Sequence, residues 1–418
     1  MRIKLHVGGI TIALLFSLVI NSAAVSDVLT LQQAIDIAIK VNPDIQAGQL
    51  SAQAAVQAAR GAKALTNPEL IVAPSVIGEA GSDAAVFFSQ PLEINGTRRV
   101  RGKIAANEAN AANFDAVTTR RDIMRDVKQT YWEVARTQEL VHLNKENIQF
   151  IETLRDAVQK QFDVGTVPGS QVLKTDVELA RARQEFAQAQ LELNQVKASL
   201  NALMNRPPNI DFTVADPIAA SVPPLDRDQL LAAAQANRPE VAAAQAELEA
   251  ARGRIQAAKL QRVPDLAVQA RRETFKSDSE SGVAIALSLP ILDWGSAKAE
   301  RRRAQTAAQS QEKRLEAVRN SAALDVEQTI QQAQATSQIV QEYQGGILEK
   351  SEQLAQMART GYEKGATSYL EVLEAQRTLR STRTAYYSAL ANRAKALAQL
   401  EWATGCDIPN NEISEVKK

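Results

Sequence analysis

The sequence YEKGATSYLEVLE, at residues 362–374, decides the fold. Gly365 interrupts a long stretch of helical spacing, and apolar residues resume directly after it. This arrangement is typical of a tight turn between two long helices. The sequence FDVGTVPGSQVL, at residues 162–173, repeats the arrangement around Gly165, 200 positions earlier. The chain is therefore expected to contain two helical hairpins, with tips near 165 and 365.

A second landmark shows the same duplication. The dipeptide Asn42-Pro43 interrupts a helical pattern in the first half, and Arg238-Pro239 interrupts a corresponding pattern 196 positions later. Because proline lacks a backbone donor and disfavours helix in the residue before it, each dipeptide predicts helix, kink and helix. A period that covers nearly the whole chain favours two copies of one unit over several unrelated domains.

The two ends of the chain are expected to lie outside the repeats. Residues 1–24 combine two basic residues, an apolar run and small residues at a cut site, which is typical of a cleaved export signal. A membrane anchor is the alternative, but the run is shorter than the roughly 20 residues that span a bilayer. Residues 409–418 are polar and are expected to be disordered. The first structural repeat then occupies 25–218 and the second 219–408.

Composition narrows the possible functions. The 418 residues include 48 basic and 48 acidic side chains, so no net field favours nucleic acid as a partner. Aromatic residues are only 4%, which suits long helices packed by small residues better than an enzyme core. After the signal, His142 and Cys406 are the only histidine and cysteine, which argues against a His-based triad and a Cys/His zinc site. We predict no enzyme activity, no metal site and no cofactor.

Two segments predict strand pairs, at about 69–91 and about 264–290. The second has a polar turn at 276–282, followed by strict alternation in which the apolar positions are Val283, Ile285, Leu287 and Leu289. One apolar face backed by small or polar residues suits a strand with lipid on one side and a water-filled lumen on the other. An edge hairpin on a soluble core is the alternative.

The longest predicted helix covers about 102–161. Apolar residues recur every seven positions in both halves, a spacing that predicts coiled-coil packing between long helices. These positions are Val127, Val134, Val141 and Ile148 in the first half and Val326, Ala333, Val340, Ile347 and Leu354 in the second. The pair Gly345-Gly346 weakens the pattern.

Basic residues follow each predicted strand pair. The basic residues are Arg98, Arg99, Arg101 and Lys103 in the first half and Arg301, Arg302 and Arg303 in the second. Steering of a ligand, contact with lipid headgroups and a solvated surface are all compatible with them.

Two strand pairs cannot close a barrel, and lipid does not tolerate open edges, so several chains must share one barrel. Three chains would supply twelve strands.

The order and spacing of these features resemble the TolC family of outer-membrane efflux proteins over essentially all of the mature chain. The resemblance implies a mainly α fold with a small β component, in a homotrimer. A twelve-stranded barrel in outer-membrane lipid, with four strands per chain, continues into an α-helical coiled-coil tunnel in the periplasm of a Gram-negative bacterium. It also implies two partners, a periplasmic adaptor and an inner-membrane RND-type pump. The sequence QPLE at 90–93, followed by Gly96, Arg98 and Arg99, resembles the heavy-metal (CzcC-like) branch.

The resemblance also implies a closed entrance at the second hairpin. Acidic residues six and nine positions after the glycine form this entrance in the family, and Glu371 and Glu374 occupy those positions. Three copies would form two rings of carboxylates that attract cations and hold a gate. The first hairpin has Gln171 and Lys174 at the equivalent positions, and Lys174 is a candidate partner for the glutamates. Alternatively, both glutamates are solvated residues on a helix face.

The hairpin tips are the surface where the resemblance places adaptor docking, at Gly165, Thr166, Gly365 and Thr367. Thr367 replaces an arginine found in some relatives, so the ion-pair latch of those relatives is not expected here. The resemblance thus implies a passive exit duct, with heavy-metal cations and drugs as candidate cargoes that the sequence alone does not separate. An exported coiled-coil spacer or tether without a lumen is the alternative, and it would need no strands.

Overall fold

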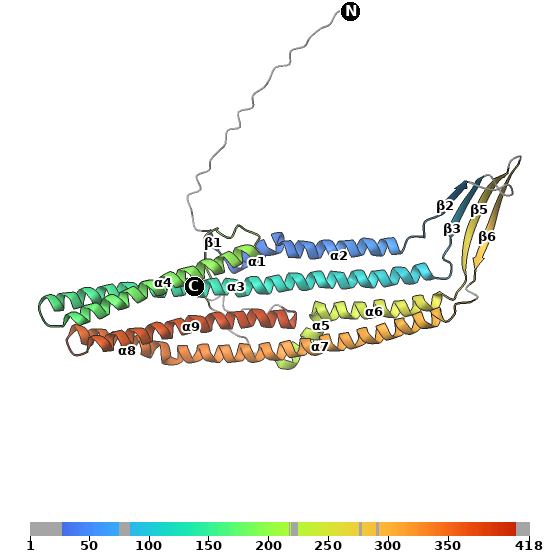
Figure 1. Ribbon diagram of the computed structural model, residues 1–418. Helices are drawn as coiled ribbons and strands as arrows, with labels where there is room; N and C mark the ends of the chain where they lie inside the picture. Colours follow the sequence, from blue (N-terminus) through green and yellow to red (C-terminus); the bar gives the residue numbers. More distant parts are fainter. Residues whose placement is uncertain are drawn as a thin grey trace, which may run out of the picture.

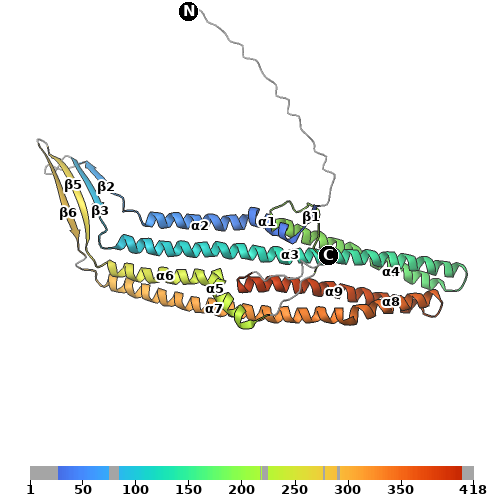
Figure 2. The ribbon, with the colours of Figure 1, turned by 180° about the vertical axis from the view of Figure 1, so that it is seen from behind.

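The computed structural model describes residues 27–74, 84–216, 218, 225–275, 278–289 and 292–406. The predicted export signal at 1–24 and the predicted disordered tail at 409–418 lie outside these residues, as does the middle of the first predicted strand pair, at 75–83. The molecule is elongated, with a sheet at one end and two helical hairpin turns at the other (Figures 1 and 2). Among the described residues, no helix is both long and apolar enough to span a bilayer.

The same order of elements occurs twice along the chain. The helices are α1 (Leu31–Val41), α2 (Pro43–Ala62), α3 (Thr97–Asp163), α4 (Gly169–Leu203), α5 (Arg227–Asn237), α6 (Pro239–Leu260), α7 (Ser296–Glu342), the π-helical turn η1 (Tyr343–Ile347), α8 (Leu348–Glu363) and α9 (Tyr369–Thr404). The strands are β1 (Asp27–Leu29), β2 (Glu69–Pro74), β3 (Ala84–Pro91), β4 (Phe212–Val214), β5 (Asp265–Phe275) and β6 (Asp278–Ser288).

The predicted kinked helices are confirmed as α1 with α2 and α5 with α6. Pro43 and Pro239 each begin the second helix of a pair, where a missing amide donor costs nothing. Asn42 caps α2, because its side-chain oxygen accepts from the amide of Asp44 at 2.9 Å. At 67 residues, α3 extends over about 100 Å, which explains the length of the molecule.

The four strands predicted from the sequence form one antiparallel sheet in the order β2-β3-β5-β6. Val283, Ile285 and Leu287 of β6 are 78%, 73% and 55% exposed, and their cross-strand neighbours on β5 continue the same face. The predicted turn at 276–282 is wrong in extent, because β6 already begins at Asp278. Backbone pairing continues the ladder past the apolar positions, so the polar residues of this segment are largely strand.

A short parallel pair of strands, β1 with β4, was not predicted. It joins the start of the first repeat to the segment that links the repeats. The hydroxyl of Tyr131, fully buried in α3, lies 2.9 Å from the Leu29 carbonyl oxygen and 2.7 Å from Asp216 Oδ2. Burial raises the pKa of Tyr131 above its ordinary value, so the hydroxyl stays protonated and holds the pair against α3.

The sevenfold pattern is confirmed along α3, where Val127 and Val134 are fully buried and Val141 and Ile148 partly buried, and along α7, but it fails from the last residue of η1 onward. Val326, Ala333 and Val340 are fully buried, whereas Ile347 and Leu354 are 47% and 49% exposed. In their place, α8 buries Ser351 and Ala358, which are again seven residues apart. The π-helical turn rotates the helix about its axis, because Gly346 adopts a φ of 131°. The two glycines therefore reset the face on which the second hairpin packs.

Candidate functional site at the hairpin tips

Each hairpin turns at a glycine in the left-handed conformation. Gly165 has a φ of 77° and Gly365 a φ of 72°, which L side chains rarely adopt. The amide of Gly165 donates to the Phe162 carbonyl, and the amide of Thr166 to the Gln161 carbonyl, both at 2.9 Å. Equivalent bonds close α8 at Gly365. Both tips therefore form the Schellman motif that ends a helix at a glycine.

The two threonines predicted at the docking surface turn toward their own hairpins. Thr166 Oγ1 donates to the Gln161 carbonyl at 2.8 Å. Thr367 packs over Gly361, where an added Cβ atom would lie only 1.8 Å from Thr367 Oγ1. The Thr166 hydroxyl thus stabilises its turn. The tips expose apolar side chains such as Val164, which is 74% exposed, beside charged ones such as Asp163 and Lys364.

The four predicted gate residues lie in the first two turns of the returning helices α4 and α9. Gln171 is half-buried, whereas Lys174, Glu371 and Glu374 are exposed. The Glu371 carboxylate accepts from the amide of Ser368 at 2.9 Å and completes a capping box that begins α9. Within the described part of one chain, Lys174 forms no ion pair with either glutamate. One chain brings both acids to the tip but does not join Lys174 to them.

The two hairpins contact each other directly above the tips. Tyr362 of α8 donates its hydroxyl to Gln161 Oε1 of α3 at 3.0 Å. Burial raises the pKa of Tyr362, so the hydroxyl remains a donor at neutral pH. An apolar cluster then joins α3 to α9, and its buried members are Leu154, Val158, Tyr369 and Leu373. The tips of one chain therefore form a single packed unit.

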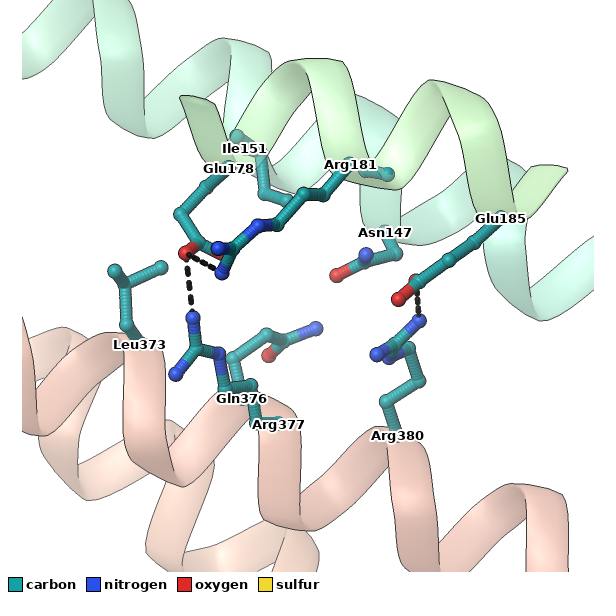
Figure 3. Close-up of a pocket in the computed structure, with 10 residues that line it drawn as sticks. Asn147, Ile151, Glu178, Arg181, Glu185, Leu373, Gln376, Arg377 and Arg380 are labelled. Atoms are coloured by element: carbon teal, nitrogen blue, oxygen red, sulfur yellow. Dashed lines mark hydrogen bonds and ion pairs between the residues drawn. The ribbon is translucent and has the colours of Figure 1, made fainter. Parts of the chain in front are cut away.

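A row of arginines on α9 extends this contact, and the sequence interpretation missed it. Arg377 bonds Glu178 of α4 at 2.6 Å, and Arg380 pairs with Glu185 of the same helix. Figure 3 shows both pairs at the rim of a cavity of about 190 Å³ between the hairpins. The bond to Glu178 raises the pKa of Arg377. The sevenfold spacing of Glu178 and Glu185 was the available signal, because it places two acids on one face of α4.

Arg383 continues this row toward the middle of the molecule. Its guanidinium reaches Glu352 of α8 at 2.8 Å and Glu146 of α3 at 3.4 Å. These pairs are partly exposed, so each adds little stability by itself. Their position specifies which faces of α3, α4 and α8 meet α9.

Comparison with known proteins shows which family has this arrangement of helices and strands. A family model described as outer membrane efflux protein matches residues 34–206 and 230–406, one segment in each repeat. The chain is 26% identical over 383 residues to the "Cobalt-zinc-cadmium resistance protein CzcC" of Cupriavidus metallidurans, covering 90% of each protein.

Two solved structures share the fold. CusC superimposes with a TM-score of 0.77 at 20% identity, covering 94% of this chain and 96% of CusC. The outer membrane protein VceC of Vibrio cholerae superimposes with a TM-score of 0.76 at 20% identity, covering 91% of this chain and 97% of VceC. The two structures confirm the predicted fold class, and the family match confirms the predicted location in the outer membrane and the role as a channel component, not an enzyme. The chain belongs to the outer membrane efflux protein family.

Proposed function

We propose that this chain forms the passive exit duct of a tripartite efflux system, in which an inner-membrane RND-type pump delivers cargo through a periplasmic adaptor. The observation that carries the proposal is the difference between the two ends of the molecule. The sheet with its exposed apolar face lies at one end, and the packed hairpin tips with two exposed acids lie at the other (Figure 1). A duct that crosses lipid at one end and receives cargo at the other needs this arrangement.

The proposed cargo is a divalent heavy-metal cation. CzcC is named a cobalt-zinc-cadmium resistance protein, and its similarity to this chain covers nine-tenths of both proteins. The proposal is tested in a bacterium that lacks its own outer-membrane channel for these metals but retains the pump and adaptor. Expression of this chain should restore growth in zinc and cobalt. Restored tolerance to a drug but not to either metal would contradict the cargo.

We propose further that Glu371 and Glu374 form the periplasmic gate in three copies. Both are exposed in the first turns of α9, where a closing tunnel would bring equivalent residues of neighbouring subunits together. One carboxylate oxygen of Glu371 caps its own helix, so Glu374 has the freer charge. Gln171 and Lys174 give the first hairpin no acid at the equivalent positions. The cation preference should therefore come from the second hairpin alone.

The gate is tested by ion conduction across a planar bilayer. The wild-type trimer should conduct and prefer cations, and the double variant Glu371→Gln/Glu374→Gln should shift the reversal potential in a salt gradient toward zero. Glu349→Gln, which removes a charge from α8 far from the turn, is the control and should leave the potential unchanged. Equal potentials in all three proteins would contradict the gate, and a protein that never conducts would revive the spacer hypothesis.

The adaptor is proposed to dock at the tips, around Gly165, Thr166, Gly365 and Thr367. Apolar side chains surround these residues without cover, and they include Val164, Leu173 and Leu370, which are 74%, 67% and 64% exposed. The double variant Leu173→Ser/Leu370→Ser should weaken capture of the adaptor in detergent while the trimer stays intact. Unchanged capture would place docking elsewhere.

A further inference from the structure

Both repeats pass from sheet to helix through the same kind of turn. Gly96 and Gly295 are in the left-handed conformation, with φ of 87° and 89°, and the next residue begins α3 or α7. Positions counted from these glycines therefore correspond in the two repeats. The turns lie between the sheet and the long helices (Figure 2).

The third and seventh residues of both helices are basic and exposed. They are Arg99 and Lys103 in α3 and Lys298 and Arg302 in α7. Residues four apart lie side by side on a helix, so each repeat presents a pair of cations on one flank. Within the described part of the chain none of the four has an ion-pair partner.

Other arginines at the same junction are used differently. Arg101 pairs with Glu93 at 2.6 Å, and Arg262 pairs with Asp293 at 3.0 Å. These pairs hold the two turns in place. Arg98 and Arg301 are also exposed and form no ion pair in the described part of the chain, but Arg98 is the second residue of α3 and Arg301 the sixth of α7. The cations at the third and seventh positions are therefore the set that the duplication repeats.

An apolar rim separates the cations from the sheet. The amide of Leu92 donates to the Leu266 carbonyl at 2.8 Å, so the ladder continues one residue past β3, and Leu92 itself is 38% exposed. Beyond it, Ile94, Leu292 and Trp294 are 64%, 73% and 92% exposed. Trp294 also has a φ of 48°, a strained conformation for a bulky residue. A strained tryptophan gains nothing from exposure to water, but the boundary between lipid chains and headgroups favours it.

We infer that the pairs Arg99/Lys103 and Lys298/Arg302 bind the phosphates of anionic phospholipids in the inner leaflet of the outer membrane. Lys298 and Arg302 follow Trp294 by four and eight residues, so at about 1.5 Å per helical residue they lie about 6 and about 12 Å from the rim along the helix axis. These distances match the headgroup region when the tryptophan lies at its boundary. A trimer repeats the site six times and forms a cationic collar continuous with the lipid-facing sheet.

The test is the lipid that the trimer retains. Wild-type trimer is purified from mixed phosphatidylglycerol and phosphatidylethanolamine vesicles, delipidated stepwise, and its bound lipid is counted by native mass spectrometry. The wild type should retain phosphatidylglycerol preferentially. The fourfold variant Arg99→Gln/Lys103→Gln/Lys298→Gln/Arg302→Gln should lose that preference at least fivefold, the factor that corresponds to about 1 kcal/mol for one basic residue near an anionic surface.

A second fourfold variant is the matched control. Lys145, Lys160, Arg314 and Arg319 are exposed basic residues farther along the same helices, and their replacement by Gln removes the same charge. It should retain phosphatidylglycerol as the wild type does, and all proteins should remain heat-resistant trimers. If both variants lost phosphatidylglycerol equally, retention would depend on the net charge of the protein and not on these four residues, and the site would be overturned. A changed reversal potential with unchanged lipid would place the cations in the lumen and also overturn it.

Discussion

The two repeats share their turns but differ in their long helices. In the first repeat α3 runs without interruption for 67 residues, whereas the second repeat divides the equivalent length among α7, η1 and α8. The left-handed residues at 165 and 365 are 200 positions apart, and so are those at 205 and 405. Duplication has therefore preserved the points where the chain reverses more strictly than the register in which the helices pack.

The returning helices begin differently as well. α4 starts after Pro168, which provides no side-chain cap, whereas Ser368 and Glu371 form a full capping box at the start of α9. A capping box stabilises a helix start by about 1 kcal/mol. The second hairpin thus combines an interrupted outgoing helix with a firmly fixed returning one, and the proposed gate lies on the fixed part.

The ends of the returning helices offer the strongest test of this comparison. Gly405 has a φ of 80°, and an added Cβ would lie 2.9 Å from Asn237 Cβ and 3.0 Å from its carbonyl carbon. Gly405→Ala should therefore destabilise the protein by about 3 kcal/mol, since a left-handed alanine costs about 1–2 and overpacking about 1–3 kcal/mol. Asn205, with a φ of 51°, is the matched position in the first repeat.

Asn205→Gly should change stability by less than about 1 kcal/mol, because asparagine tolerates the left-handed conformation and glycine adopts it freely. Thermal unfolding of the detergent-solubilised protein, followed by circular dichroism at the helix band, measures both variants. Similar losses at 205 and 405 would show that contact with the α5–α6 kink does not distinguish the repeats.

Replacing the glycine at either hairpin tip by alanine should destabilise the protein by a similar amount, and by less than Gly405→Ala does. No neighbouring atom lies within 4 Å of a Cβ added at Gly165 or Gly365, so only the left-handed backbone is at issue. Each Gly→Ala change should destabilise its hairpin by about 1–2 kcal/mol. Gly61→Ala, in the helical backbone of α2 and also in open space, is the control and should be neutral or stabilising. Hydrogen exchange of the two tips would reveal any inequality between the hairpins.

The sequence predicted the elements well because their signals are local. Pro43 and Pro239 mark the kinks, Gly165 and Gly365 mark the tips, and alternation marks β6. What it missed depends on contacts between distant segments. The parallel pair of β1 with β4 needs Tyr131 as its support, and the rotation at Gly346 moves Ile347 and Leu354 away from the buried face.

The candidate site was only partly predictable for the same reason. Glu371 and Glu374 lie at fixed distances from a recognisable turn, so the sequence could locate them at the tip. The row of arginines on α9 could not be assigned partners, because Glu178, Glu185 and Glu352 come from two other helices. The faces that meet depend on the packing of both hairpins together.

The two junctions between sheet and helix should differ in their response to acid, the smallest effect expected here. The hydrogen bond from Arg101 lowers the pKa of Glu93, whose side chain is 7% exposed. The hydrogen bond from the Gly295 amide, followed by that from Arg262, lowers the pKa of Asp293, whose side chain is 29% exposed. A carboxylate with a lowered folded pKa stabilises the fold above its unfolded pKa, and this contribution is lost as the pH falls through the folded value.

Heat resistance of the wild-type trimer should therefore decline as the pH falls below about 4, where free Asp and Glu carboxyls take up protons, and on through the lowered folded pKa values of Glu93 and Asp293. Glu93→Gln should be less stable at neutral pH and should lose part of that decline. Asp293→Asn should change the profile less, because solvent screens the more exposed pair. The dissociation temperature of the trimer, measured across this range for all three proteins, checks the order. A larger change for Asp293→Asn than for Glu93→Gln would contradict this order, because Asp293 would then contribute more to the stability of the trimer than Glu93 does.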